Sequence, residues 1–332
     1  MPNRALVLSG GGSRGAFEVG AVDYLVNDAG LAFHVIAGVS TGSLNAVMLA
    51  QGHGPEGLRA QVAALKDLWF GIRSAADVYR KRFLGAILAF LLKDSIYAPE
   101  PLRRSIEQHV DPERLRGSGR ELRIGATILE SGAYTAVDQR QAQVREWTLA
   151  SASMPLLFPP VRLGAEAVVD GGLRNVTPLG DAFKALKVLP PSADGRPDEV
   201  YVALASPLDL LPVVSRWSTG RAAGERAVDI LVNEVFREDL SYALAINRAV
   251  RAHAELAGYC AGRPAEQRAL DAMPFRPPKY RDTRIRTIAP DREYSGTLEF
   301  DPRKIREAFE AGRVAARRPL DEEELEALLE RS

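Results

Sequence analysis

The chain has 332 residues, enough for one large core or two domains, and its 46% hydrophobic and 26% charged residues are ordinary for a soluble globular protein. Its 43 lysines and arginines balance its 43 aspartates and glutamates, so the net charge gives no support for nucleic acid or another polyanion as the partner. The single cysteine, Cys260, excludes an internal disulfide framework and indicates a reducing compartment.

The first fifty residues alternate between strand and helix patterns. Residues 6–8 are an apolar run typical of a buried strand, residues 16–29 predict a helix, and residues 34–37 predict a second strand. Residues 40–50 are rich in alanine, leucine and methionine and predict the next helix. This order predicts a mostly parallel sheet covered by helices.

Further helices and strands are predicted along the rest of the chain. The pattern is largely helical over residues 52–111. Strands are predicted at residues 122–129, 133–137, 144–147, 165–170, 200–204 and 283–288, and helices at 221–256, 302–317 and 321–329. We therefore expect a single domain over residues 1–332, with its main motifs in 5–180, a helical insertion over about 52–111 and a helical C-terminal region over about 221–332.

The glycine-rich segment GGGSRG, residues 10–15, directly follows the first predicted strand. It fits G-x-G-x-x-G, in which backbone amides bind an anion. A dinucleotide site also needs an acidic residue at the end of the second strand, and a triphosphate site needs Lys and then Ser or Thr after the last glycine. The second strand ends in AGVSTG and Gly15 is followed by Ala16, so neither nucleotide pattern is met.

The end of the second predicted strand carries Gly38-Val-Ser40-Thr-Gly42, a G-x-S-x-G sequence. Between a strand and a helix this pattern is typical of a nucleophile elbow, a turn so tight that Gly38 and Gly42 cannot carry side chains. The helix that follows would direct its N-terminal amides toward Ser40. The alternative interpretation is a Gly-Ser turn that only caps a helix.

A serine nucleophile needs a base, and four histidines can be compared by their reach. His34 and His53 each lie about 20 Å from Ser40 along the predicted strand and helix. His109 and His253 remain open as bases of a histidine-dependent esterase, although neither follows a strand, where a triad histidine belongs.

Asp170 is the better candidate for the base. It ends an apolar strand and is followed by Gly171 and Gly172, so its carboxylate should emerge at a sheet edge with little shielding. A carboxylate within hydrogen-bond reach could take the Ser40 proton directly. The alternative is an Asp-Gly turn without a chemical role.

Together, these three segments resemble the patatin-like phospholipases, serine acyl hydrolases that use a Ser-Asp dyad without histidine. The resemblance rests on residues 10–15, residues 38–42 and the Asp170-Gly171-Gly172 motif. It extends to residues 150–155 (ASASMP), 158–161, Asn175, Pro178 and 298–302. It covers the full chain, strongly to about residue 180 and more loosely after that.

The resemblance implies a three-layer α/β/α fold with a central, mostly parallel sheet. It implies Ser40 as the nucleophile, Asp170 as the base, and hydrolysis of a lipid ester through an acyl-serine, without a cofactor or metal. The implied oxyanion loop comprises Gly10, Gly11, Gly12, Ser13, Arg14 and Gly15. In it, Gly11 and Gly12 would supply backbone amides, and Arg14 would support the loop or meet a lipid phosphate. A non-catalytic lipid- or partner-binding protein of the same fold is the alternative from another class.

Residues 79–93 combine basic residues with the apolar run FLGAILAFLL. We expect this segment to be a lid or an interfacial anchor in peripheral contact with anionic lipid, with a helix buried in the core as the alternative. The run has about ten residues, short of the roughly twenty needed to span a bilayer, and no secretory signal is recognised. We therefore expect a cytoplasmic protein. No spaced His/Cys cluster or acidic loop predicts a metal site.

Overall fold

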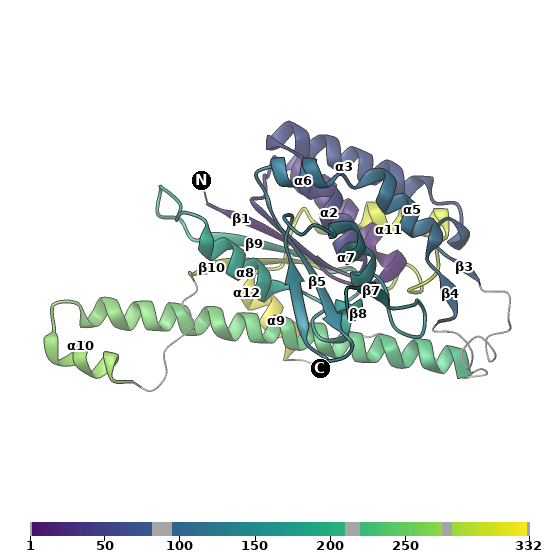
Figure 1. Cartoon of the computed structure of the whole chain (residues 1–332). Coiled ribbons are helices and arrows are strands. Elements are labelled where there is room, and N and C mark those ends of the chain that lie inside the picture. The colour runs from purple at the N-terminus through teal and green to yellow at the C-terminus, as the bar shows by residue number, and fades with distance from the viewer. Residues whose placement is uncertain (1, 82–94, 210–219, 274–280, 331–332) are drawn as a thin grey trace.

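The computed structural model describes residues 2–81, 95–209, 220–273 and 281–330 (Figure 1). At its centre lies an eight-stranded sheet in the order β10-β9-β1-β2-β5-β8-β7, with β6 also paired to β5. The strands are β1 (Arg4–Leu8), β2 (Val35–Val39), β5 (Glu121–Ile128), β6 (Tyr134–Val137), β7 (Val161–Leu163), β8 (Glu166–Asp170), β9 (Asp198–Ala203) and β10 (Thr283–Ile288). A separate pair is formed by β3 (Arg80–Lys81) and β4 (Tyr97–Ala98).

The sheet is mostly parallel. β10, β9, β1, β2 and β5 run in one direction, whereas β6, β7 and β8 pair antiparallel. The central strands β1 and β2 are almost wholly apolar and are buried on both faces, as this architecture requires. Along β1, Leu6 and Leu8 pack into one core, while Ala5 and Val7 pack into the core on the opposite face.

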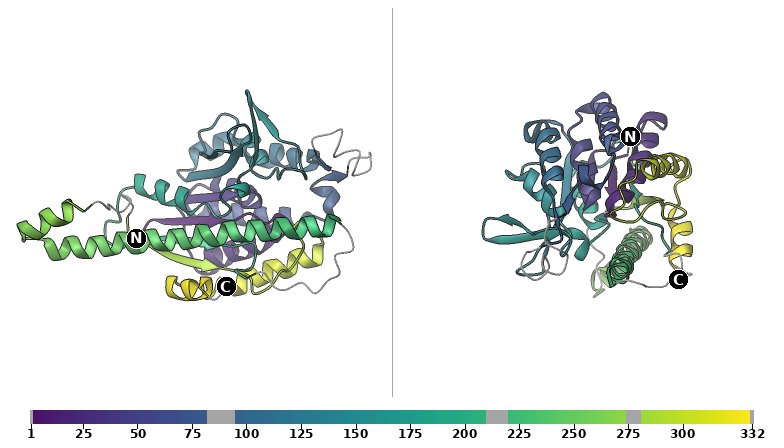
Figure 2. Two further views of the ribbon diagram at one scale, coloured as in Figure 1. Left: turned by 90° about the horizontal axis from the view of Figure 1, so that it is seen from below. Right: turned by 90° about the vertical axis from the view of Figure 1, so that its right-hand side faces the viewer.

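Helices cover both faces of the sheet and make the three-layer α/β/α fold that was predicted (Figures 1 and 2). The first layer contains α1 (Gly15–Asp23), α2 (Thr41–Ala50), α3 (Gly54–Gly71), α5 (Glu100–His109), α6 (Pro112–Gly117), α7 (Val144–Ser151) and α11 (Pro302–Ala315). The second contains α8 (Leu179–Val188), α9 (Gly220–Cys260) and α12 (Glu322–Leu329). The C-terminal end of α9, with α10 (Pro264–Asp271), extends beyond the sheet (Figure 1).

Most predicted elements are present, but the strand predicted at residues 144–147 is wrong. These residues begin α7, in which Val144 and Trp147 are buried while Arg145 and Glu146 between them are half-buried. Buried residues three and four apart fit a helix, and four residues are too few to distinguish that spacing from a strand. The apolar run of the predicted membrane-contact segment, residues 83–92, lies outside the described residues.

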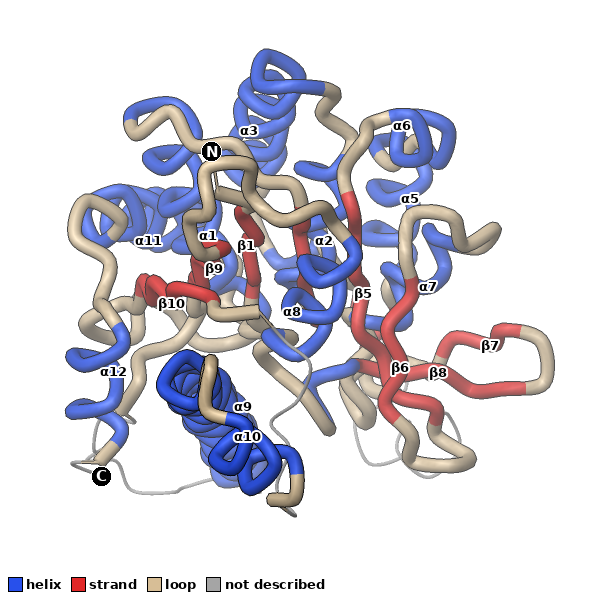
Figure 3. The backbone as a smooth tube through the Cα atoms, turned by 90° about the vertical axis from the view of Figure 1, so that its left-hand side faces the viewer, coloured by secondary structure: helices blue, strands red, loops and turns tan. Residues whose placement is uncertain are grey.

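One junction in the sheet brings distant segments together. Gly125 of β5 pairs with both Val39 of β2 and Ala136 of β6, so β2 and β6 occupy opposite edges of β5. The next residue, Ala126, pairs with both β6 and Asp170 of β8, so β8 also lies opposite β6. β2 and β8 therefore share one edge of β5, and their C-terminal ends meet there. Figure 3 shows β6, β7 and β8 gathered at one end of β5.

Candidate active site

Ser40 lies on the turn between β2 and α2. Its backbone angles, φ 55° and ψ −127°, are rare for a residue other than glycine. A Cβ atom on Gly38 would overlap the carbonyl oxygen of Gly42, and one on Gly42 would overlap the carbonyl oxygen of Leu8. The turn has the geometry of a nucleophile elbow, and it requires glycine at both flanking positions.

Ser151 braces this turn from α7. Its Oγ accepts a hydrogen bond from Ser40 N (3.0 Å) and donates one to Gly125 O on β5 (2.6 Å). The Ser40 carbonyl oxygen accepts from Ser43 Oγ (2.6 Å), which ties the turn to the first turn of α2. The sequence analysis assigned no role to Ser151. Its only signal was its place in the ASASMP segment of the family resemblance.

Asp170 ends β8 at the same junction. Its N–H donates to Ser153 O (3.0 Å), and its Oδ1 accepts from Gly172 N (2.8 Å). Its Oδ2 is buried without a hydrogen-bond partner in the described part of the chain. Burial raises the pKa of Asp170 to about 7, against smaller opposing effects of the Ser40 hydroxyl and the Gly172 N–H. A carboxylate with one uncommitted oxygen therefore lies beside the serine.

The glycine-rich loop passes directly over Ser40. A Cβ on Gly10 would lie 3.1 Å from Ser40 Cβ. Four of the six loop N–H groups are already bonded: Gly10 to Val176 O, Ser13 to Thr297 O, Arg14 to Gly11 O, and Gly15 to Gly12 O. The N–H groups of Gly11 and Gly12 have no hydrogen-bond partner among the described residues. These are the two amides that the sequence analysis expected to face an oxyanion.

Arg14 and Ser13 fasten the loop to a segment near the C-terminus. Arg14 is buried; it donates from Nε to Ser295 O (3.1 Å) and from Nη1 to Ser206 Oγ (3.1 Å), and its Nη2 lies 3.5 Å from Glu293 Oε1. The Ser13 and Ser295 hydroxyls are 2.9 Å apart. Both roles expected for Arg14, support of the loop and contact with a lipid phosphate, stay predictions. The segment that holds Arg14 and Ser13 follows β10 and carries no motif, so no signal in the sequence pointed to it.

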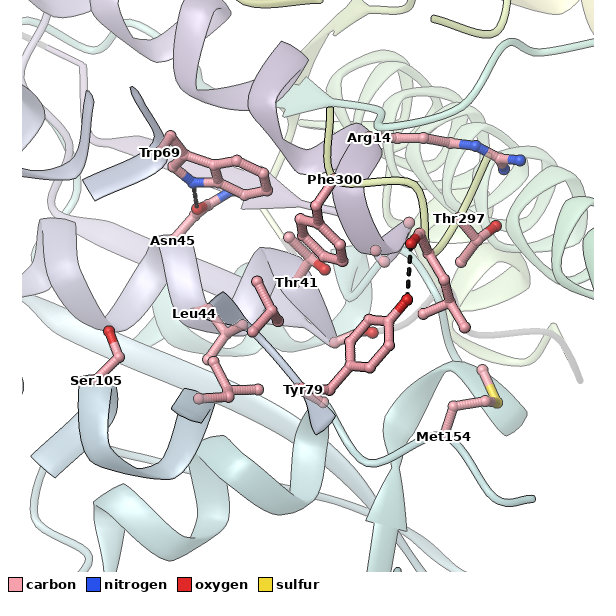
Figure 4. Close-up of a pocket in the computed structure, with 18 of the residues that line it drawn as sticks. Arg14, Thr41, Leu44, Asn45, Trp69, Tyr79, Ser105, Met154, Thr297 and Phe300 are labelled. Carbon is pink, nitrogen blue, oxygen red and sulfur yellow. Dashed lines mark hydrogen bonds between the residues drawn. The ribbon is translucent and has the colours of Figure 1, made fainter. Parts of the chain in front are cut away.

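A cavity of about 220 Å³ begins at the glycine loop, Ser40 and Asp170 and runs between α2, α3 and α5 (Figure 4). Its lining is mainly apolar and includes Leu44, Val47, Met48, Leu65, Leu68, Trp69, Leu102, Ile106, Met154, Leu157, Phe158, Leu298 and Phe300. Two hydrogen bonds stiffen the wall: Trp69 Nε1 donates to Asn45 Oδ1 (2.9 Å), and Tyr79 Oη donates to Leu298 O (2.9 Å). The shape and chemistry suit an apolar chain attached to a carbonyl group at Ser40.

Of the four histidines, all within the described residues, His109 alone lines the cavity, on the α5 wall. Its Nδ1 lies 2.9 Å from Ser105 O on its own helix. His34 precedes β2, at the end of that strand away from Ser40, where its Nδ1 accepts from Arg4 N (3.1 Å). Among the described residues, no hydrogen bond joins a histidine to Ser40, whereas Asp170 lies beside it.

The described residues contain no group of three or more His, Cys, Asp or Glu side chains placed to hold a metal ion. In the same residues no helix is both long and apolar enough to cross a membrane.

A sequence model described as patatin-like phospholipase matches residues 6–183, more than half of the chain. No curated protein gives a match. Among solved structures, VipD from Legionella pneumophila is 12% identical over 99% of this chain and 67% of its own, with a TM-score of 0.38. The type III effector protein ExoU is 14% identical over 99% of this chain, with a TM-score of 0.35, and this chain spans 53% of its length. The family assignment therefore rests on the sequence match.

Proposed function

Because the chain belongs to the patatin-like phospholipase family, a family of lipid acyl hydrolases, we propose that it hydrolyses carboxylic esters of lipids through an acyl-Ser40 intermediate. One observation carries the proposal. The uncommitted Oδ2 of Asp170 lies with Ser40 and with the free N–H groups of Gly11 and Gly12 at one end of an apolar cavity. A base, a nucleophile and oxyanion donors thus meet where an acyl chain would place its carbonyl group.

In the first half-reaction, Ser40 Oγ attacks the ester carbonyl carbon and its proton passes to Asp170 Oδ2. The carbonyl oxygen becomes an oxyanion and accepts hydrogen bonds from Gly11 N and Gly12 N. In comparable sites each such donor contributes about 10²- to 10³-fold to kcat. The carbon–oxygen bond to the alcohol then breaks, and the leaving alkoxide takes the proton from Asp170. Acyl-Ser40 remains.

In the second half-reaction, a water molecule attacks the acyl carbon while Asp170 accepts its proton. The same two amides bind the second oxyanion. When the bond to Ser40 Oγ breaks, Asp170 returns the proton to the serine and the fatty acid leaves. One carboxyl group therefore alternates between base and acid, which a side chain does best when its pKa is close to the working pH. The pKa of Asp170, raised by burial to about 7, meets this condition.

The test is hydrolysis of p-nitrophenyl esters of graded chain length by the wild type, Ser40→Ala, Asp170→Asn and His109→Ala. We expect turnover in the wild type and in His109→Ala, and none above background in the other two. Circular dichroism and thermal unfolding verify that each variant is folded.

Each alternative gives a distinct result. Turnover that survives Ser40→Ala would refute the acyl-Ser40 proposal, and loss of turnover in His109→Ala alone would indicate a histidine-dependent esterase. Absence of hydrolysis by the folded wild type on both p-nitrophenyl esters and phospholipid vesicles would favour a lipid-binding protein without catalysis.

A further inference from the structure

Asp239 of α9 accepts hydrogen bonds from the segment that follows the Asp170-Gly171-Gly172 motif. Its Oδ2 accepts from the backbone N–H groups of Val176 (3.0 Å) and Thr177 (3.1 Å). The Asn175 side-chain amide, oriented with its nitrogen toward the acceptors, donates to the same oxygen (3.0 Å). Three consecutive residues, 175–177, thus donate hydrogen bonds to one carboxylate oxygen, and that carboxylate belongs to α9 in the second helical layer.

The same segment also holds the glycine loop. The Val176 carbonyl oxygen accepts from Gly10 N (3.2 Å), and Gly10 lies against Ser40. This carbonyl and the Thr177 N–H belong to one peptide group, which is planar, so its two polar ends point in opposite directions. Asp239 accepts a hydrogen bond from the N–H end of this peptide group, and Gly10 donates one to its carbonyl end. The position of the carboxylate therefore determines where the carbonyl oxygen is presented to the loop.

We propose that Asp239 is a positioning residue for the oxyanion hole, acting through the peptide group between Val176 and Thr177 and through Gly10. Gly10 is followed directly by Gly11 and Gly12, whose N–H groups have no hydrogen-bond partner among the described residues. A shift of Gly10 would move both donors relative to Ser40, and displacements of about 1 Å cost roughly 100-fold in rate at such sites. The inference rests on the proposed function, because it assigns Asp239 to the same site.

The surroundings of Asp239 make a purely solubilising role a poor explanation. Asp239 is half-buried, and this burial raises its pKa to about 7, with further raising effects of Glu238 on α9 and Asp181 on α8. Asp181 in turn accepts from Tyr134 Oη of β6 (2.7 Å). Ionising a carboxyl group that is half removed from water and lies near other acids costs free energy. The three donors from residues 175–177 offset that cost.

The test compares Asp239→Ala and Asp239→Asn with two control variants on the same helix. Arg237→Gln removes another attachment of α9, since Arg237 donates to Leu208 O (3.0 Å) and Leu329 O (2.7 Å) without touching residues 175–177. Glu234→Gln changes an exposed charge one turn away. Arg237→Gln therefore reports the effect of loosening α9, and Glu234→Gln reports the effect of losing a negative charge. Only the Asp239 variants also lose the connection to Gly10.

In the ester assay, we expect Asp239→Ala to lower kcat by about 10- to 100-fold with KM within about twofold of the wild type. Asp239→Asn should retain more activity, because its oxygen still accepts hydrogen bonds. Both controls should keep kcat within about twofold. A kcat for Asp239→Ala within twofold of the wild type, or an equal loss in Arg237→Gln, would overturn the proposal.

Hydrogen exchange followed by mass spectrometry gives a second measurement that does not need activity. In Asp239→Ala, the peptide containing residues 9–15 should exchange faster than in the wild type or in Arg237→Gln, because the Gly10 N–H loses its fixed acceptor. Unchanged exchange would refute the connection. If the wild type shows no Ser40-dependent hydrolysis, the proposed function fails, and the exchange result still decides whether Asp239 holds the loop.

Discussion

Replacing Asp170 with asparagine should abolish ester hydrolysis and stabilise the protein at neutral pH. The loss of activity follows because an amide cannot accept the Ser40 proton. The gain in stability follows because the wild type must ionise a carboxyl group that is 1% exposed and whose Oδ2 has no hydrogen-bond partner in the described structure. If Asp170 is the proposed base, this cost is a trade of stability for function.

The size of the gain follows from the pKa. The folded-state pKa of Asp170 is about 7, compared with about 3.9 in an unfolded chain. A difference of about three units corresponds to roughly 4 kcal/mol. Because the folded state binds the proton more tightly, the contribution of Asp170 to stability is greatest below about pH 4, is lost as the pH rises to about 7, and changes little beyond that.

The assay is thermal unfolding of the wild type and Asp170→Asn at several pH values from 4.5 to 8.5. For a chain of 332 residues, the entropy of unfolding is about 0.7 kcal/mol/K, so roughly 4 kcal/mol corresponds to about 6 °C. The Tm of the variant relative to the wild type should therefore rise by several degrees across this range. Asp239, whose pKa is also about 7, is present in both proteins, so its contribution cancels.

Asp67→Asn, at an exposed position of α3, is the control and should show no such trend. A Tm difference for Asp170→Asn that is the same at pH 5 and pH 8 would refute the reasoning, because the destabilising ionisation would then not occur in the folded wild type.

Three further predictions follow from the same site. The kcat/KM of the wild type should rise with pH and level off above about pH 7, because only ionised Asp170 accepts a proton; a flat pH–rate profile between pH 5.5 and 8.5 would contradict its role as the base. Gly12→Ala should lower kcat by about 100-fold or more and also lower the Tm, because φ at this position is +60° and a Cβ would overlap Thr297 O. An unchanged kcat would show that Gly12 is not part of the oxyanion hole. Trp69→Phe should reduce the free energy of unfolding by about 1–3 kcal/mol in urea titrations, since buried Asn45 Oδ1 loses its donor. A free energy of unfolding equal to that of the wild type would mean that this bond contributes little.

The local turns of the candidate site could be predicted from the sequence. The tight turn around Ser40 is encoded within five consecutive residues, because it leaves no space for side chains at Gly38 and Gly42. The alternation of apolar runs and helical patterns likewise predicted the mostly parallel sheet, since burial on both faces leaves a continuous apolar run in each strand. The family followed from the order of three such local motifs.

The tertiary structure decided which side chains meet. Asp170 reaches Ser40 because β8 lies antiparallel on the edge of β5 where β2 ends, and no local pattern encodes such a pairing between distant strands. Packing also decided that Val176 and Thr297 bind two of the loop amides while those of Gly11 and Gly12 stay free. The raised pKa of Asp170 has the same origin, because burial is a property of the assembled core. The sequence by itself determined the chemical groups and the turns that carry them, and long-range packing determined their partners, their solvation and hence their reactivity.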